Sequence, residues 1–253
     1  VGDASGNGNT AIIRGANWTE GVMDYSLEFD GINDFLEVPH NKGINPVEDL
    51  SISAWVNTSE ATGEQQIIVD KRSGAKQGYV LALDAEGNPF FKVGDGTDEC
   101  RVIGNLDLRD DEWHSIVGTW DSQGGVSVLY VDGIPVVTSV KHGLSSIFNN
   151  NSLRMGAASY TETDHLKGSL DEILILDRTL SSREILAISN RVCLNATLRS
   201  NTITTPKNHT LDFLYFKRYI PTNCYLNISI RDAETDEILL MDDGKKPQPF
   251  NWA

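Results

Sequence analysis

Acidic and amide side chains gather where predicted strands meet their turns. Asp30, Asn33 and Asp34 lie in a tight turn between two alternating segments, and Asp171 lies in another alternating segment far along the chain. Calcium takes six to eight oxygen ligands at about 2.3–2.6 Å, so a few carboxylates with turn carbonyls and water would hold it. The sequence therefore predicts a Ca²⁺ site here. The alternative is that Asp30 and Asn33 only cap the turn by hydrogen bonding to nearby amides.

A second acidic cluster lies in the loop 95–99, where Asp95 and Asp98 could face a ligand or another cation. Acidic loop tips are more often only solvated surface, so these two residues are weak ligand-binding candidates. Tyr160, in the loop 159–165, is the exposed aromatic candidate.

The tryptophans are a further source of sugar-stacking surface, because an aromatic face packs against the apolar face of a sugar ring. Those considered are Trp18, Trp55, Trp113 and Trp120. Trp55 and Trp120 alternate with apolar residues inside predicted strands, which favours core packing for both.

The segments that carry these residues alternate apolar and polar side chains with a period of two, as half-buried strands do. The sequence predicts strands at 26–30, 35–39, 50–58, 65–71, 78–84, 89–94, 100–108, 112–121, 126–132, 134–140, 153–158 and 168–177. Asp132-Gly133 between apolar runs is typical of a tight hairpin. Ser181, three residues before Glu184, forms a capping box and predicts a helix over 181–190. Many short strands at this spacing predict a sandwich of two antiparallel sheets.

The two parts of the chain differ in net charge. The formal net charge of −15 argues against nucleic-acid binding, which needs clustered Lys and Arg. Residues 1–190 hold 13 Lys and Arg against 29 Asp and Glu, whereas residues 191–253 hold 8 against 7. This shift predicts a β-sandwich domain over 1–190 and a small β-rich domain over 191–253, incomplete or completed by a partner. The apolar runs are too short to span a bilayer, so we expect no transmembrane segment.

A resemblance to the laminin-G-like branch of the concanavalin A-like lectin/glucanase superfamily is carried by the stretches 3–9, 15–19, 26–39 and 166–178. It implies an all-β, concanavalin A-like antiparallel sandwich, or jelly roll, with one short C-terminal helix. In this family the elements matching Asp30 and Asp171 lie side by side, and a structural Ca²⁺ there is frequent. The residues after 190 resemble a β-rich module of some archaeal surface proteins.

The same resemblance bears on catalysis. The glucanase relatives carry Glu-x-Asp-x-Glu on one strand, which places three carboxylates on one face, and no predicted strand here has that spacing. A nucleophile elbow, a Walker loop and a His-Glu-x-x-His motif are also missing from the sequence. We therefore expect a protein that is not an enzyme.

Glycosylation acceptor patterns point to a secreted, extracellular or cell-surface protein. The Asn-x-Ser/Thr sites are Asn17, Asn57, Asn150, Asn195, Asn208 and Asn227, although some could match by chance in a chain rich in Ser and Thr. Of the three cysteines, Cys193 and Cys224 flank the first strands of the small domain and could form a disulfide, which leaves Cys100 as a buried thiol.

Three functions remain open from the sequence. The first is a non-catalytic extracellular module for adhesion or for recognition of carbohydrate or protein, with glycans, surface proteins or copies of itself as partners. The second is a structural subunit of a surface layer or extracellular filament, assembled by strand addition at an open sheet edge. The third is an accessory binding module of a sugar-active enzyme.

Overall fold

The computed structural model describes residues 1–46, 48–161 and 163–190, together with two short strands, β15 (Ile228–Arg231) and β16 (Ile238–Asp242). The chain divides into two units after Asn190, and each is described by itself. In the second unit β15 and β16 pair antiparallel. The predicted disulfide cysteines and the acceptors Asn195, Asn208 and Asn227 lie outside the described residues.

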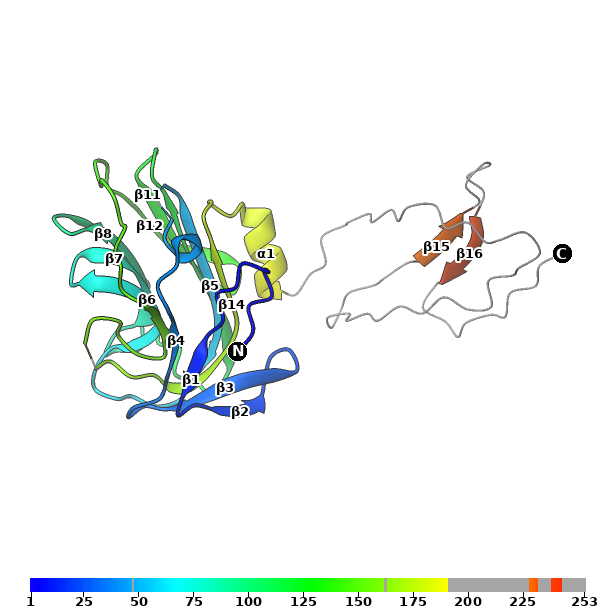
Figure 1. Ribbon diagram of the computed structural model, residues 1–253, viewed down its shortest axis with the longest axis horizontal. Helices are drawn as coiled ribbons and strands as arrows, with labels where there is room; N and C mark the ends of the chain where they lie inside the picture. The colour runs from blue at the N-terminus through cyan, green and yellow to red at the C-terminus, as the bar shows by residue number, and fades with distance from the viewer. Residues whose placement is uncertain (47, 162, 191–227, 232–237, 243–253) are drawn as a thin grey trace. The chain divides into compact units, whose positions relative to one another are not determined.

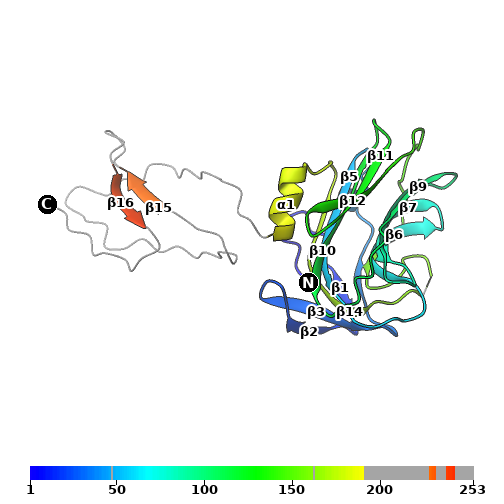
Figure 2. The same ribbon diagram turned by 180° about the vertical axis from the view of Figure 1, so that it is seen from behind.

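Residues 1–190 form two antiparallel sheets of seven strands each, stacked face to face (Figures 1 and 2). Sheet A contains β1 (Ile12–Arg14), β4 (Phe35–Val38), β6 (Gln66–Gly74), β7 (Gln77–Leu83), β8 (Pro89–Asp95), β9 (Glu99–Ile103) and β13 (Leu153–Met155). Sheet B contains β2 (Asn17–Glu20), β3 (Tyr25–Asp30), β5 (Leu50–Asn57), β10 (Trp113–Asp121), β11 (Val126–Val131), β12 (Ile134–Val140) and β14 (Lys167–Leu176).

The strand order is β1-β4-β13-β6-β7-β8-β9 in sheet A and β12-β11-β10-β5-β14-β3-β2 in sheet B. Because neighbours in each sheet are often far apart in sequence, both sheets are built by crossovers between the layers. This architecture confirms the predicted all-β sandwich with one short helix. The two edge strands on one side, β1 and β2, are consecutive in the chain, so residues 15 and 16 link the sheets there.

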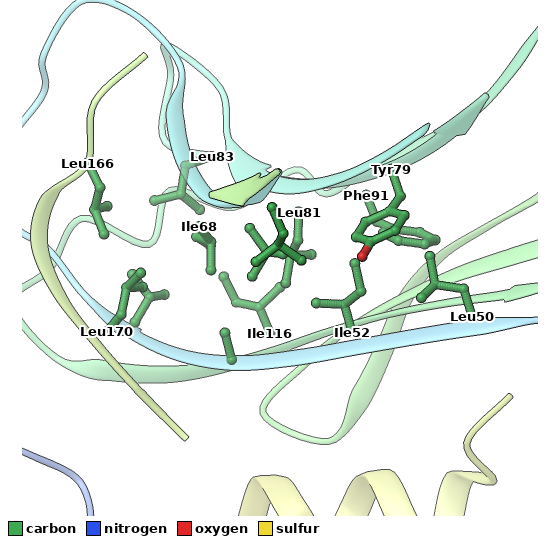
Figure 3. Close-up of a cluster of buried hydrophobic side chains, with 14 of the residues drawn as sticks. Leu50, Ile52, Ile68, Tyr79, Leu81, Leu83, Phe91, Ile116, Leu166 and Leu170 are labelled. Atoms are coloured by element: carbon green, nitrogen blue, oxygen red, sulfur yellow. The ribbon is translucent and has the colours of Figure 1, made fainter. Parts of the chain in front are cut away.

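The core lies between the sheets and follows the alternation read from the sequence. Tyr79 and Leu81 of β7 point toward the strand that carries Leu50 and Ile52 of β5, and Leu83 of β7 lies beside Ile68 (Figure 3); these side chains are fully buried. Burying a large apolar side chain contributes roughly 1.5–3 kcal/mol, so these facing strands hold the layers together.

A single short helix, α1 (Ser182–Asn190), closes the unit on the outer face of sheet B. The predicted capping box is confirmed: the Ser181 amide donates to Glu184 Oε2 at 2.9 Å, and the Glu184 amide donates to Ser181 Oγ at 3.4 Å. Leu180 and Ile185 pack against Val117 of β10. The helix α1 therefore covers part of the outer face of sheet B.

The hairpin at Asp132-Gly133 is as predicted, with φ of 50° and 80°. The structure differs from the predicted elements in three other places. The segment predicted at 153–158 ends at Met155, because Gly156 adopts φ +86° and its Cα faces the ring of Phe29. The strands β1 and β2 were not predicted, since each is a short edge strand with only three or four residues. The segment predicted at 100–108 likewise ends early, at Ile103.

Candidate functional site

Two exposed aromatic side chains stand next to each other on the hairpin β2–β3. Trp18 pairs with Leu27, and Glu20 pairs with Tyr25, which is two residues before Leu27. Residues opposite one another or two apart share a face of the sheet, so Trp18 and Tyr25 lie on the core-facing side with Leu27. Diagonal neighbours of this kind are about 7–8 Å apart. The two side chains therefore lie as neighbours on one face of the hairpin.

These aromatics remain exposed although they face the core side of sheet B. Trp18 is 57% exposed and Tyr25 is 71% exposed, whereas Leu27, two residues further from the hairpin turn than Tyr25, is 5% exposed. A core-facing aromatic pair left open to solvent is unusual, because each ring buries a large apolar area when it is covered.

A cleft of about 930 Å³ opens beside the pair, and we call it the amino-terminal cleft. Its floor consists of core side chains from both sheets, namely Leu27, Leu36, Val38, Leu153, Met155 and Leu170. Its walls come from the amino-terminal residues, which lie beside β14 and β1 (Figure 1), and from the end of β14. The volume is within the range of about 300–1,000 Å³ that is usual for small-molecule sites.

The amino-terminal wall is held in shape by Asp3. Its carboxylate accepts hydrogen bonds from the Ser5 amide at 2.9 Å, the Ser5 hydroxyl at 2.6 Å and the Asn9 amide at 2.9 Å. The Ser5 hydroxyl and then these amides lower the pKa of the Asp3 carboxyl. The turn presents Asn7 to solvent, and Asn41, the cap of the 3-10 helix η1 (Lys42–Ile44), also lines the cleft.

Asp171 positions the aromatic hairpin. Its Oδ2 accepts a hydrogen bond from the Met23 amide at 3.0 Å, in the turn between β2 and β3, and lies close to the Cα of Gly21. Its Oδ1 accepts from the Glu172 amide at 2.8 Å, where β14 bulges and Glu172 adopts φ 47°. The bulge in β14 therefore turns a buried carboxylate toward the hairpin that carries Trp18 and Tyr25.

The residues predicted to hold calcium occupy two separate places. The Asp30 amide donates to Asp34 Oδ2 at 3.1 Å, and Asp30 Oδ1 accepts from the amides of Ile32 and Asn33 at 2.8 and 3.2 Å. Asp30 therefore does cap its own turn, as the alternative interpretation had it.

Asp171 does not lie in this turn. Lys167 pairs with Asp30, so Asp171 is four residues along β14 from the partner of Asp30, roughly 13 Å away at about 3.3 Å per residue. Within the part of the chain that the structure describes, no group of three or more His, Cys, Asp or Glu side chains is arranged to hold a metal ion. The side chains do not surround a common point as they stand, and the calcium site remains a prediction that melting curves with calcium and with chelator would test.

The other ligand candidates are engaged within the protein. Asp95 accepts from the amides of Thr97, Asp98 and Ser145, and these hydrogen bonds, the one from Ser145 foremost, hold the pKa of Asp95 well below its usual range. Asp98 forms an ion pair with Lys141 at 3.1 Å.

Tyr160 lies 5.0 Å from the guanidinium of Arg72, which in turn pairs with Asp70 at 2.7 Å. Tyr160 is 38% exposed, less than either Trp18 or Tyr25. Trp55 and Trp120 are buried, as predicted, at 8% and 1% exposure. Of the four tryptophans considered, Trp18 is the one with a largely exposed ring.

The remaining predicted sites are placed as follows. Cys100 is a buried free thiol. Asn17 and Asn150 are exposed, whereas Asn57 is half-buried and its side-chain amide donates to the Asp111 carbonyl at 2.8 Å. Whether any of these asparagines is glycosylated stays a prediction.

Sequence reasoning missed Tyr25 and its place beside Trp18 on one face of the hairpin. The available signal was the alternation of Tyr25 with Leu27 and Phe29, which places all three side chains on one strand face. Without a predicted β2, Trp18 had no strand partner. The cleft itself had no signal in the sequence, because its walls come from segments distant in the chain.

Comparison with known families and structures adds to this geometry. Residues 30–186, more than half of the chain, match the family model of the Concanavalin A-like lectin/glucanases superfamily. Among curated protein sequences, none matches the chain. No helix among the described residues is long and apolar enough to cross a membrane.

Solved structures share the fold at low identity. The binding domain of Paraclostridial Mosquitocidal Protein 1 aligns with a TM-score of 0.64 and 20% identity, covering 75% of this chain and 49% of that chain. The binding domain of botulinum neurotoxin serotype G aligns with a TM-score of 0.62 and 15% identity, covering 75% and 48%. This chain thus spans about half the length of the toxin binding domains that it matches.

A carbohydrate complex is also among the similar structures. Domain 4 of AbnA, a GH43 extracellular arabinanase from Geobacillus stearothermophilus, was solved with arabinotriose and aligns with a TM-score of 0.59 and 16% identity. The alignment covers 74% of this chain and 91% of that domain. At such identities the likeness shows the shared fold.

Proposed function

Because this chain belongs to the concanavalin A-like lectin/glucanase superfamily, we propose that residues 1–190 form a non-catalytic module that binds glycan chains outside the cell. The observation that carries this proposal is the exposed aromatic pair, Trp18 and Tyr25, at the mouth of the amino-terminal cleft. A sugar ring has an apolar face that stacks on an aromatic ring and hydroxyl groups that need hydrogen-bond partners.

The cleft supplies both kinds of contact. Its apolar contribution is the aromatic pair and the core side chains of the floor, and its polar contribution comes from Asn7, Asn41 and the carboxylates of the walls. Sites of this composition, mostly apolar with a few polar groups for orientation, are typical of small-molecule binding. Trp18 and Tyr25 lie on a hairpin that the hydrogen bond between Asp171 and Met23 ties to β14. Because this holds the two side chains in place before a ligand binds, less conformational entropy is lost on binding.

The similar structures support binding over catalysis. The toxin structures are binding domains, one of them, botulinum neurotoxin DC, was solved in complex with SialylT, and the arabinanase domain was solved with arabinotriose. Because these relatives share the fold at low identity, they support the class of function and leave the ligand open.

An extracellular place of action is supported by two observations. Two acceptor asparagines, Asn17 and Asn150, lie on the surface of the described unit. The arabinanase whose domain is among the similar structures is described as extracellular.

A glycan array followed by isothermal titration calorimetry tests the proposal. The wild-type chain should bind at least one class of oligosaccharide on the array. Trp18→Ala and Tyr25→Ala should each weaken that binding about tenfold, since a stacked ring contributes about 1.5 kcal/mol. Melting curves and circular dichroism should show that both variants fold.

The matched control is Tyr160→Ala, which removes an exposed aromatic ring outside the cleft. It should leave the affinity unchanged. Loss of binding in Tyr160→Ala with retention in Trp18→Ala would move the site to the loop 159–165 and refute the cleft as the binding site. Failure of the wild-type chain to bind any glycan on the array would refute the function itself.

Assembly by strand addition is an alternative that one observation favours. The strand β12 forms an edge of sheet B, and Ile134 and Val140 on it are 64% and 58% exposed. An apolar edge strand can pair with a strand from another chain. Light scattering over a concentration series tests this alternative, since self-association should raise the apparent mass and Ile134→Lys should reverse it.

A further inference from the structure

We propose that the amino-terminal cleft receives a β-strand from another, basic polypeptide, which pairs with an open edge of β14. This inference goes beyond the proposed function, because the partner is a peptide and backbone hydrogen bonds hold it. The observation behind it is that β14 loses one of its two neighbours in sheet B halfway along its length.

The second half of β14 has a strand partner on one side only. β3 pairs with β14 from Lys167 to Leu170, whereas β5 pairs with it as far as Leu176. In an antiparallel sheet, alternate residues turn their N–H and C=O groups to opposite sides of the strand. Within residues 173–176, alternate backbone groups therefore point away from β5, into the space beyond the end of β3.

The hairpin β2–β3 explains why this edge is open. The Met23 amide donates to Asp171 Oδ2 at 3.0 Å, so the hairpin turn is tied beside Asp171 and β3 reaches no further along β14. Within the described part of the chain, no backbone hydrogen bond joins residues 173–176 to the amino-terminal wall. A strand edge with unpaired N–H and C=O groups is a template for pairing with another chain.

The cleft reaches both faces of this half of β14. Ile173 and Ile175 pack against the core, and Leu174 points to the other face of the strand, yet all three line the cleft. One cavity reaches both faces of a strand only around its edge, so the edge itself borders the cleft. Residues 173–176 span about 13 Å at about 3.3 Å per residue, which is the length of a short strand.

The floor of the cleft suits a strand with apolar side chains at alternate positions. An added strand would continue the layer of sheet B and face sheet A, where Leu36, Val38 and Met155 line the cleft. Every second side chain of the added strand would meet this floor, and the others would point to the outer face. In strand addition, main-chain hydrogen bonds supply affinity and pockets for alternate side chains supply specificity. A sugar chain has no regular series of N–H and C=O groups to match the edge.

The charge of the unit favours a basic partner. Residues 1–190 hold 13 Lys and Arg against 29 Asp and Glu, so the field around the unit is negative. This field attracts a peptide that carries Lys or Arg, and it repels a second copy of the unit, which has the same charge. Charge complementarity therefore indicates a different polypeptide as the source of the strand.

Fluorescence anisotropy with labelled peptides tests the proposal on the full chain. The probe is an octapeptide with Val or Ile at alternate positions and Lys or Thr between them. Two N-methylated versions each block the backbone N–H groups along one edge of the peptide. The parent peptide should bind, and the version blocked on the pairing edge should bind at least about tenfold more weakly. The version blocked on the other edge should retain its affinity.

The same assay tests the charge of the partner. With Glu in place of Lys, the peptide should bind several-fold more weakly in about 0.05 M NaCl, and the difference should narrow in about 0.5 M NaCl, because salt screens exposed charges. An acidic peptide that binds as tightly as the basic one would contradict a basic partner.

A matched pair of leucine variants assigns the binding to β14. Leu174 is 39% exposed and lines the cleft, whereas Leu186 on α1 is 46% exposed and lies outside the cleft lining. Leu174→Lys should weaken peptide binding at least about tenfold, because the basic peptide would meet a positive charge beside the edge. Leu186→Lys makes the same change in net charge and should leave the affinity unchanged. Melting curves of both variants monitor the fold.

Hydrogen exchange locates the contact without a variant. The parent peptide should slow exchange of amides within residues 173–176, since those that point away from β5 gain a partner. The peptide blocked on its pairing edge should not slow them.

The outcomes decide the proposal. Equal affinity of the parent and both N-methylated peptides would show that the contact is not a strand pairing. Equal losses in Leu174→Lys and Leu186→Lys would trace binding to overall charge. If no peptide binds, or if light scattering shows copies of the chain joined through this edge and separated by Leu174→Lys, the assigned partner is wrong. None of these measurements uses a glycan, so the proposed function is tested separately.

Discussion

Trp120 and Trp18 both face the core side of sheet B, yet one is 1% exposed and the other 57% exposed. On the side of Trp120, β9 lies against β12 and the ring of Phe91 packs directly onto Gly118. On the side of Trp18, the facing sheet ends at the short strand β1, and the amino-terminal cleft begins. The same residue type in the same kind of strand position serves as core in one place and as open surface in the other.

The difference teaches that strand pattern alone does not decide burial. A residue on the inner face of a sheet is covered only where the opposite sheet extends over it. The opposite sheet covers Trp120, whereas beside Trp18 it ends at β1. A binding surface can therefore form from core-type residues at the margin of a sandwich.

The sharpest test of this comparison is the stability of the two tryptophan variants. Trp120→Ala should lower the free energy of unfolding by about 3–5 kcal/mol, because it leaves a cavity in a closed core. Trp18→Ala should change it by no more than about 0.5 kcal/mol, as expected for an exposed position. Urea denaturation measures both. Equal losses in the two variants would show that the two sides are packed alike.

If Trp120→Ala fails to fold, Trp120→Phe offers a milder change, with an expected loss of about 1–3 kcal/mol from the smaller ring. The corresponding Trp18→Phe should remain close to the wild type in stability.

The next largest effect concerns Lys71, a fully buried ammonium beneath the loop that precedes β13. Its Nζ donates to the Asn149 carbonyl at 3.1 Å, to Asn149 Oδ1 at 3.3 Å and to the Asn151 carbonyl at 3.0 Å. Lys71→Met would leave these acceptors without their donor, and we expect a loss of about 1–3 kcal/mol in the free energy of unfolding.

Lys71 also predicts a pH dependence. Burial lowers the pKa of Lys71 from 10.5 to about 8. Between these values the unfolded chain holds a proton that the folded chain has released, so the Lys71 contribution to stability rises with pH across this window. The wild type should therefore gain stability relative to Lys71→Met from about pH 8 to about pH 10.5. A constant difference over this range would contradict the assignment.

A third prediction concerns Asp171, which ties the aromatic hairpin to β14. Asp171→Ala removes the acceptor of the Met23 amide, and we expect a loss of about 1–2 kcal/mol in the free energy of unfolding. Hydrogen exchange should show faster exchange in residues 21–25 and little change in β5. Protection of the hairpin at the wild-type level would refute this positioning role.

The smallest expected effect is at His114, which lies between Asp132 at 2.8 Å and Asp110 at 3.1 Å. The hydrogen bond to Asp132, with further help from Asp110, raises the pKa of His114 above 6.5. Because the folded state holds the proton more tightly, this stabilisation is present in full below about pH 6.5 and is lost as pH rises through the raised pKa.

We expect the wild type to exceed His114→Gln by about 0.5–1 kcal/mol at pH 5.5, and by less at pH 9. Thermal melts at the two pH values measure the difference. An advantage that grows toward pH 9 would contradict the sign of the shift.

Much of the fold could be predicted because it depends on local pattern. Alternation placed the long strands, Asp132-Gly133 marked a hairpin, and Ser181 with Glu184 marked the start of α1. These signals act over a few residues, through backbone conformation and capping hydrogen bonds. The edge strands β1 and β2 were not predicted, because three or four residues carry too little alternation to be recognised as a strand.

The candidate site was harder to predict because its parts are distant in the chain. Asp171 was singled out from the sequence for its place beside a strand end, and the structure shows its carboxylate bonded to the Met23 amide, 148 residues away. The predicted calcium association of Asp171 with Asp30 depended on a register that sequence does not specify. Tyr25 became a candidate binding residue only when the structure showed that β2 places Trp18 next to it.

The sequence by itself determined the all-β architecture, the acidic character of residues 1–190 and the side of each strand on which its apolar residues lie. These follow from residue type and period, which act locally. The tertiary structure decided which apolar residues are covered and that a cleft opens beside Trp18 and Tyr25. Coverage and proximity depend on how far one sheet extends over the other, and that is fixed only when segments distant in sequence pack together.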